Sequence, residues 1–147
     1  VLDLGAGPGQ ATIELKRRYR SSQVVALDVA EGMLREARRR QTLLRRFQRV
    51  CADAAALPVR DSEFDVALLS LVLSYASEPA AVLGEAARAL QPGGRILLTD
   101  LMPHEQVELR QRFGQQWQGF SEDTVRAWLE SAGKGHLSGF AEAWPAG

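Results

Sequence analysis

The chain has 147 residues, of which 46% are hydrophobic, and its 18 Lys and Arg residues are balanced by 18 Asp and Glu residues. This length and composition predict one globular domain with a single core. The zero net charge gives no sign of an acidic or basic partner, and no apolar run reaches the roughly 18 residues that a membrane span needs.

Charge and cysteine content narrow the function classes further. Residues 1–50 hold 11 of the 18 basic residues and 5 of the 18 acidic residues. We interpret this excess as the solvated face of a helix rather than as a nucleic-acid patch, because Phe47 is the only aromatic residue interleaved with the arginines between positions 35 and 49. Cys51 is the single cysteine, which excludes an internal disulfide, and we expect it to be a buried inert thiol in a strand. These features favour a cytoplasmic localisation.

The first ten residues predict a short strand, a tight loop and the start of a helix. Three hydrophobic residues flank Asp3, and glycines follow at positions 5, 7 and 9. Ala11–Arg20 permits a helix, with Ala11, Leu15 and Tyr19 on its apolar face. Glycines between a strand and a helix let the backbone approach a ligand closely, and they point a helix N-terminus at it.

The rest of the chain continues this alternation of strands and helices. Strands are predicted at Val24–Val29, Arg49–Asp53, Phe64–Ser70 and Arg95–Asp100, and helices at Glu31–Phe47, Pro79–Leu90, Pro103–Trp117 and Ser121–Gly133, with a last strand at His136–Trp144. The alternation predicts an α/β domain with a doubly wound, mostly parallel sheet.

Polar residues follow several of these strands directly. The glycine loop, Asp28, Asp53, Ser70 and Asp100 all lie at or just after a predicted carboxyl end. Ligands of doubly wound sheets bind at that edge, where the strand order reverses. The sequence therefore predicts a nucleotide-like ligand there.

The segment from Asp3 to Gly9 resembles the acid-x-Gly-x-Gly-x-Gly signature of class I S-adenosylmethionine-dependent methyltransferases. Asp28, Asp53, the Phe64-Asp65 strand and Pro92-Gly93-Gly94 match later motifs of that family in order and spacing. The resemblance implies a Rossmann-like fold that binds S-adenosyl-L-methionine and methylates a small-molecule acceptor, with residues 1–147 forming one methyltransferase domain. The family's fold has further segments before and after these motifs, so we expect the chain to be truncated at both ends.

The resemblance also implies roles for individual residues. Asp3 orients the loop or receives the cofactor's ammonium group, Asp28 accepts from both ribose hydroxyls, and Asp53 accepts from the adenine amino group. The full set of predicted cofactor-binding residues is Asp3, Gly5, Ala6, Gly7, Gly9, Asp28, Val29, Met33, Asp53, Ala54 and Ser70.

A narrower resemblance comes from Met102-Pro103-His104-Glu105 and Gly119-Phe120-Ser121. These segments resemble the methyltransferase half of bacterial proteins that carry an ArsR-type winged-helix regulator upstream, and also stand-alone small-molecule methyltransferases such as ubiquinone-biosynthesis enzymes. A winged-helix domain outside this chain and a homodimer are left open by this resemblance.

The expected chemistry is an in-line attack of a nucleophile on an activated methyl group. Such a reaction needs proximity and orientation, and it needs a base only if the nucleophile arrives protonated. Tyr75 and His104 are the candidate bases by their location. The sequence contains no metal-binding or nucleoside-triphosphate motif, so no metal is predicted.

Two alternatives remain at this stage. A nicotinamide-dinucleotide-binding oxidoreductase would need a glycine where Gln10 stands, and its third glycine comes one place early at Gly9. A non-catalytic module that binds S-adenosylmethionine as a sensor is compatible with the same residues.

Overall fold

A computed structural model describes residues 1–41, 46–106, 108 and 112–133. The elements in chain order are β1 (Leu2–Leu4), α1 (Gln10–Arg18), β2 (Val25–Asp28), α2 (Glu31–Arg40), β3 (Gln48–Cys51), β4 (Phe64–Ser70), the 3-10 turn η2 (Leu73–Tyr75), α3 (Pro79–Ala89), β5 (Leu90–Thr99) and α5 (Glu122–Ser131).

The five strands form one parallel sheet in the order β3-β2-β1-β4-β5. From β1 the chain moves outward through β2 to β3, and then returns to place β4 on the other side of β1. The strand order therefore reverses between β1 and β4, which is where such sheets bind ligands. This topology confirms the predicted doubly wound α/β fold.

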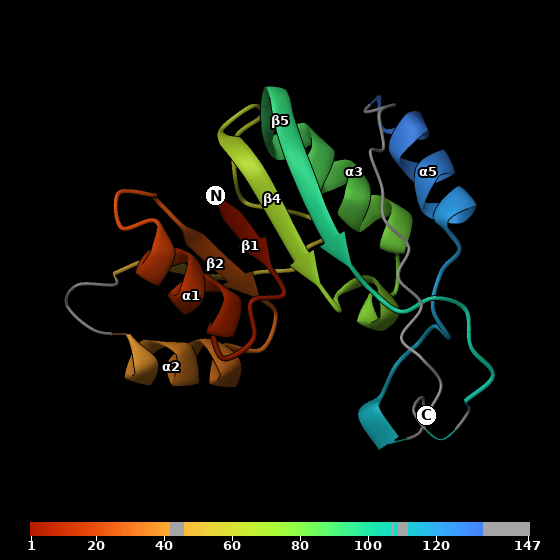
Figure 1. The fold of residues 1–147 in the computed structure, drawn as a ribbon, viewed down its shortest axis with the longest axis horizontal. Coiled ribbons are helices and arrows are strands. Elements are labelled where there is room, and N and C mark those ends of the chain that lie inside the picture. Colours follow the sequence, from red (N-terminus) through yellow and green to blue (C-terminus); the bar gives the residue numbers. More distant parts are fainter. Residues whose placement is uncertain (42–45, 107, 109–111, 134–147) are drawn as a thin grey trace.

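Helices cover both faces of the sheet (Figure 1). Helices α1 and α2 lie on one face, where a small core contains Ala26, Ala37 and Phe47. Helices α3 and α5 pack on the other face, over a larger core to which the strands contribute residues such as Leu4 and Leu69. Because both faces are covered, the central strands β1 and β4 are mostly apolar, whereas the edge strands β3 and β5 carry several polar residues.

Helix α1 corrects one prediction. The predicted apolar face of Ala11, Leu15 and Tyr19 does not point into the core, and Tyr19 is 56% exposed. The buried residues are instead Thr12 and Lys16. Thr12 donates a hydrogen bond to Asp3 of β1, and Lys16 Nζ donates to two backbone carbonyls beyond the helix. Polar groups with such partners can be buried at little cost, so periodicity of apolar residues misplaced the face.

Cys51 corrects a second prediction. It ends β3 at the edge of the sheet and is exposed, with its Sγ donating to Val29 O at 3.5 Å. The arginines of α2 follow the prediction of a solvated face, since Arg35 pairs with Glu31 at 3.3 Å and Arg40 with Glu36 at 3.1 Å. Such exposed pairs contribute little to stability.

The third quarter of the chain agrees closely with the sequence. Strand β4 has the predicted bounds, and α3 begins at Pro79 as expected. Strand β5 differs, because it begins at Leu90 instead of the predicted Arg95 and therefore includes Pro92-Gly93-Gly94. An irregularity between Phe64 and Val66 of β4 accommodates this stretch.

The last third shows a helix cap and one shorter helix than predicted. Ser121 caps α5 by accepting from Thr124 N at 3.2 Å, as the sequence indicated. The helix predicted over Pro103–Trp117 falls partly on residues outside the description, and the described residues 103–106 and 115–117 are not helical. The strand predicted at His136–Trp144 lies outside the described residues.

Candidate functional site

The glycine loop joins β1 to α1 in a conformation that its glycines make accessible. Gly5, Gly7 and Gly9 have φ angles of 64°, 54° and 79°, all in the left-handed region that other residues avoid. Gly9 is the N-cap of α1 and donates its N–H to Ala6 O at 2.9 Å. Ala6 in turn donates to Leu27 O at 3.0 Å, which ties the loop to β2.

Gly5 and Gly7 differ in what surrounds them. A Cβ added to Gly5 would lie 2.6 Å from a methyl group of Val72, so the segment after β4 packs directly on this glycine. A Cβ added to Gly7 would meet no atom within 4 Å. The loop is therefore closed by packing at Gly5 and open at Gly7.

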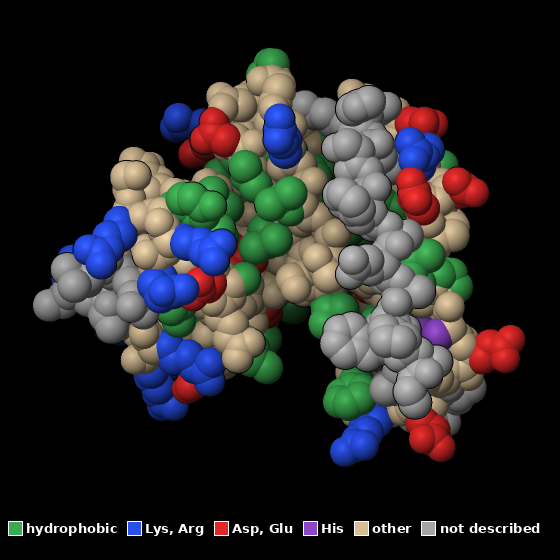
Figure 2. All heavy atoms as spheres, in the orientation of Figure 1, with side chains coloured by type: hydrophobic (Ala, Val, Ile, Leu, Met, Phe, Trp, Pro, Cys, Tyr) green, Lys and Arg blue, Asp and Glu red, His purple; other side chains and the backbone are tan. Residues whose placement is uncertain are grey.

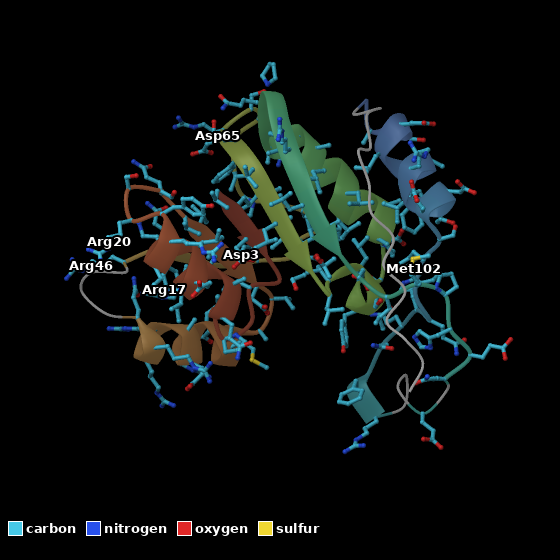
Figure 3. The ribbon with its side chains drawn as sticks, in the orientation of Figure 1. Asp3, Arg17, Arg20, Arg46, Asp65 and Met102 are labelled. Carbon is cyan, nitrogen blue, oxygen red and sulfur yellow. The ribbon has the colours of Figure 1, made fainter. Side chains whose placement is uncertain are left out.

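Asp3 lies beneath the loop and is 1% exposed. Figure 3 shows it between β1 and α1, where its Oδ2 accepts from the Thr12 hydroxyl. Burial raises the pKa of the Asp3 carboxyl to about 6, against the opposing effect of the bonds from Thr12. The contact ties β1 to α1 on either side of the loop, and both predicted roles of Asp3, orienting the loop and receiving the cofactor's ammonium group, stay predictions.

Asp28 connects the end of β2 to the glycine loop. Its Oδ2 accepts the Gly7 N–H at 2.8 Å, and its Oδ1 accepts the Ala30 N–H at 2.8 Å. Each carboxylate oxygen has a further lone pair, so these bonds leave acceptor capacity for ribose hydroxyls. The sequence placed Asp28 at this edge but did not indicate its bond to the loop.

The next strand brings Asp53 beside Asp28. Ala52 N donates to Asp28 O at 3.1 Å, which holds the ends of β2 and β3 together. Asp53 is exposed and uses Oδ1 to accept from Ala55 N at 2.8 Å, while Ala54 is half-buried. The predicted hydrogen bond from an adenine amino group would fall on the other oxygen of Asp53.

Two apolar side chains stand exposed between these acids. Val29 is 73% exposed and Met33 is 48% exposed. Val29 directly follows β2, and Met33 lies in the first turn of α2. Their predicted role in cofactor binding stays a prediction.

The remaining predicted residues lie on the β4 side. Ser70 ends β4 and is exposed, and Tyr75 in η2 is 41% exposed. His104 is half-buried, and its Nδ1 accepts from Gln106 N at 3.2 Å. This bond places the proton of a neutral imidazole on Nε2, a buried atom without a hydrogen-bond partner in the described part of the chain.

Sequence reasoning missed the network that holds the end of β5 to η2. Asp100 accepts from Leu73 N at 2.8 Å, from Leu101 N at 2.9 Å and from the Ser74 hydroxyl. Asp100 was noted only as a strand-end acid, and no local pattern could reveal partners that are 26 and 27 residues away.

Other features lie away from this site or are not found. A cavity of about 790 Å³ opens at the opposite, amino-terminal edge of the sheet, and Lys16, Arg46 and Asp65 are among its lining residues (Figure 3). None of the predicted site residues lines it. The described ranges contain no cluster of residues suited to holding a metal ion, and no helix within them has the length and apolar character of a membrane span.

The chain matches known proteins in both sequence and structure. A model of the methyltransferase domain family matches residues 2–98. A malonyl-[acyl-carrier protein] O-methyltransferase of Halorhodospira halophila is 44% identical over 110 residues, which cover 75% of this chain and 37% of that protein. A demethylmenaquinone methyltransferase of Clavibacter sepedonicus is 41% identical over 100 residues, covering 68% of this chain and 40% of that protein.

Solved structures show the same fold. Phosphoethanolamine N-methyltransferase 2 of Haemonchus contortus, solved in complex with S-adenosyl-L-methionine, superimposes with a TM-score of 0.76 at 20% sequence identity. The superposition covers 90% of this chain and 32% of that protein. The chain spans about two fifths of the length of the two sequence relatives described above.

The family match over residues 2–98 covers about two thirds of the chain and includes the glycine loop, Asp28 and Asp53. The chain belongs to the family of S-adenosylmethionine-dependent methyltransferases.

Proposed function

We propose that this chain is the cofactor-binding part of an enzyme that transfers a methyl group from S-adenosylmethionine to a small-molecule acceptor. The observation that carries the proposal is the arrangement at the reversal of strand order. There an open glycine loop is fixed by a carboxylate from the neighbouring strand, Asp28, whose bond to Gly7 N is 2.8 Å long.

The described residues fit this cofactor. The open space above Gly7 leaves room for the methionine part, and the first amides of α1 favour its carboxylate. Asp28 would hold the ribose, and Asp53 with the Ala54 amide would hold the adenine between Val29 and Met33. When bound, the cofactor supplies a methyl group that is already activated by its sulfonium sulfur.

The protein then contributes mainly orientation, which in well-aligned reactions is worth up to roughly 7–11 kcal/mol. Tyr75 is the better placed of the two candidate bases, because its side chain is 41% exposed at the end of the sheet where the acceptor must approach. An acceptor that arrives deprotonated would need neither Tyr75 nor His104.

The two sequence relatives act on very different acceptors. One methylates a malonyl group on a carrier protein, and the other methylates demethylmenaquinone, by their names. The acceptor of this chain is therefore tested with both an acidic and an apolar compound. The predicted homodimer, upstream winged-helix domain and cytoplasmic localisation stay predictions.

Calorimetry on the full-length protein that contains this chain tests the cofactor. S-adenosylhomocysteine is expected to bind and NAD is not. Folded protein that takes up NAD, or that fails to bind S-adenosylhomocysteine, would refute the proposal.

A second assay separates an enzyme from a sensor. Transfer of a labelled methyl group from S-adenosylmethionine to any compound of an acceptor panel supports the enzyme. Tight binding of the cofactor without transfer to any of a broad panel, which includes malonyl thioesters and naphthoquinols, would favour the sensor.

A further inference from the structure

Exposed apolar side chains concentrate at the carboxyl edge of the sheet. Four of them come from the segments that follow β4 and β5, with exposed fractions between 39% and 48%: Leu71, Tyr75, Met102 and Trp117. We call these four residues the apolar wall. Figure 2 shows a hollow between the α1 and α2 side of the molecule and the arm formed by the residues after β5, with hydrophobic side chains on both of its sides.

Hydrogen bonds connect the segments that carry Tyr75, Met102 and Trp117. Trp117 Nε1 donates to Ala76 O at 2.8 Å, which seats the indole beside the turn that carries Tyr75. Phe120 N donates to Leu101 O at 2.9 Å and His104 N to Gln118 O at 3.0 Å, so the segments on either side of Met102 and Gly119 run alongside each other. A Cβ on Gly119 would lie 2.2 Å from Met102 O, which shows how close this pairing is.

Ser74 connects the end of β5 to the segment that carries Trp117. It is fully buried, its hydroxyl donates to Asp100, and its carbonyl accepts from Gln116 N at 2.8 Å and Trp117 N at 3.2 Å. One residue of η2 thereby holds both the end of β5 and the segment that carries Trp117. Buried groups satisfied on several sides form rigid networks.

The same turn reaches the cofactor loop. Val72 packs on Gly5, and the residue before it, Leu71, has a φ of 56°, an unusual conformation for a leucine. Leu71 N donates to Thr99 O at 2.8 Å, so β5 holds this conformation in place. Strained backbone of this kind persists where the surroundings fix it, often beside ligands.

The chemistry of the wall indicates its ligand. Its four side chains are uncharged, and the nearby Asp100 carboxylate is already used by three donors within 2.9 Å. An acidic acceptor would need a paired cation in such a site, whereas aromatic side chains favour a planar apolar molecule.

We propose that the apolar wall binds a planar, uncharged acceptor, and that Ser74 is a positioning residue that couples this wall to the cofactor loop. The inference rests on the proposed function for the identity of the neighbouring ligand. It narrows the acceptor to the apolar class and assigns Ser74 a role in the coupling between the two ligands.

Calorimetry with 1-naphthol as a planar uncharged probe, and with malonate as an acidic one, tests the wall. The full-length protein is titrated with each probe, in the presence and absence of S-adenosylhomocysteine. We expect 1-naphthol to bind, and Trp117→Ala and Tyr75→Ala each to weaken its binding at least tenfold while S-adenosylhomocysteine affinity changes less than twofold. Tyr19→Ala, which removes a more exposed aromatic ring just after the carboxyl end of α1, is the control and should change neither affinity.

The coupling has its own readout. In the wild type, 1-naphthol should raise the affinity for S-adenosylhomocysteine about fivefold or more, and linkage requires the reciprocal effect. The coupling ratio is the affinity for S-adenosylhomocysteine with 1-naphthol divided by the affinity without it, and Ser74→Ala should bring this ratio close to one. If that variant does not fold, Asp100→Asn, which weakens the same contact from the other side, takes its place.

Three outcomes would overturn the inference: equal 1-naphthol affinity in Trp117→Ala and wild type, preferential binding of malonate, or an unchanged coupling ratio in a folded Ser74 or Asp100 variant. Loss of S-adenosylhomocysteine binding in the wild type would instead refute the proposed function. In that case, the 1-naphthol titration without S-adenosylhomocysteine still tests whether the apolar wall binds a planar uncharged molecule.

Discussion

Single residues of the candidate site have unusual surroundings or backbone conformations. Asp3 is a buried carboxyl whose pKa is raised to about 6, and Gly5, Gly7 and Gly9 adopt a backbone conformation that costs other residues about 1–2 kcal/mol. Neither feature is explained by stability alone. Both are expected where a backbone loop must hold a ligand closely.

The Asp3 carboxyl makes stability depend on pH. Because its pKa is about 6 in the folded state and near 3.8 when unfolded, the native state binds the extra proton between these values. This contribution to the free energy of unfolding therefore falls as pH rises from about 4 to 6 and stays low above pH 6. A shift of this size corresponds to about 3 kcal/mol.

Asp3→Asn keeps an acceptor for Thr12 and removes the charge. We expect the variant to be more stable than the wild type at pH 8 by up to about 3 kcal/mol, and by less at pH 5. Urea denaturation at the two pH values measures both differences. An advantage that does not shrink at pH 5 would contradict the assignment to Asp3.

Gly5 and Gly7 form a matched pair for the glycine loop. Both Gly→Ala changes should cost about 1–2 kcal/mol for the left-handed backbone. Gly5→Ala should cost about 1–3 kcal/mol more, because its Cβ would collide with Val72. Gly7→Ala should chiefly reduce S-adenosylhomocysteine affinity, since its Cβ would enter open space on the ligand side. Denaturation and calorimetry together separate the two effects, and equal stability losses would argue against the packing at Gly5.

At the scale of elements, the site is held together by contacts between strand ends. Asp28 at the end of β2 bonds the loop after β1, and Asp100 after β5 bonds the turn after β4. These side-chain hydrogen bonds hold neighbouring loops together, as backbone hydrogen bonds hold neighbouring strands together. A change at one strand end is therefore expected to alter the neighbouring loop.

Asp28→Ala should weaken S-adenosylhomocysteine binding more than tenfold while the fold stays intact. The variant loses charge-assisted bonds to the ribose and also the acceptor of the Gly7 N–H. Calorimetry measures the affinity and circular dichroism the fold. Asp65→Ala is the control, because it removes an exposed acid at the start of β4, on the opposite edge of the sheet (Figure 3). Unchanged affinity in Asp28→Ala would contradict the ribose assignment.

At the scale of the molecule, the sheet separates two different ends. Its carboxyl edge carries the glycine loop, the acids and the apolar wall, whereas its amino edge carries a cavity lined by residues such as Lys16 and Arg46. Because helices cover both faces of the sheet, the loops that connect the strands are accessible only at its amino and carboxyl edges. The reversal of strand order between β1 and β4 distinguishes the carboxyl edge as the ligand site.

Ligand binding at this edge should stabilise the whole fold. S-adenosylhomocysteine at 100 times its dissociation constant is expected to raise the free energy of unfolding by about 2.7 kcal/mol, if the unfolded chain does not bind it. Thermal denaturation with increasing ligand checks this, and NAD at equal concentrations is the control. A midpoint that NAD raises and S-adenosylhomocysteine does not would contradict the cofactor assignment.

The sequence by itself predicted the succession of strands and helices as far as β5, and the edge of the sheet that carries the candidate site. Strand β4 and the start of α3 follow from a run of apolar residues and from Pro79, which are local signals. The glycine loop and Asp28 were identified because a strand-end position and a residue type are visible in the sequence. Local physics decides such features, since they depend on neighbouring residues alone.

Only the tertiary structure decided which side chains meet. The buried face of α1 depends on Asp3 as a partner for Thr12, and the exposure of Cys51 depends on β3 being the edge strand. The contact of Val72 with Gly5 and the bonds of Ser74 join segments that are distant in the chain. Periodicity carries no information about such pairs, because their energy comes from packing and hydrogen bonds between elements that the fold brings together.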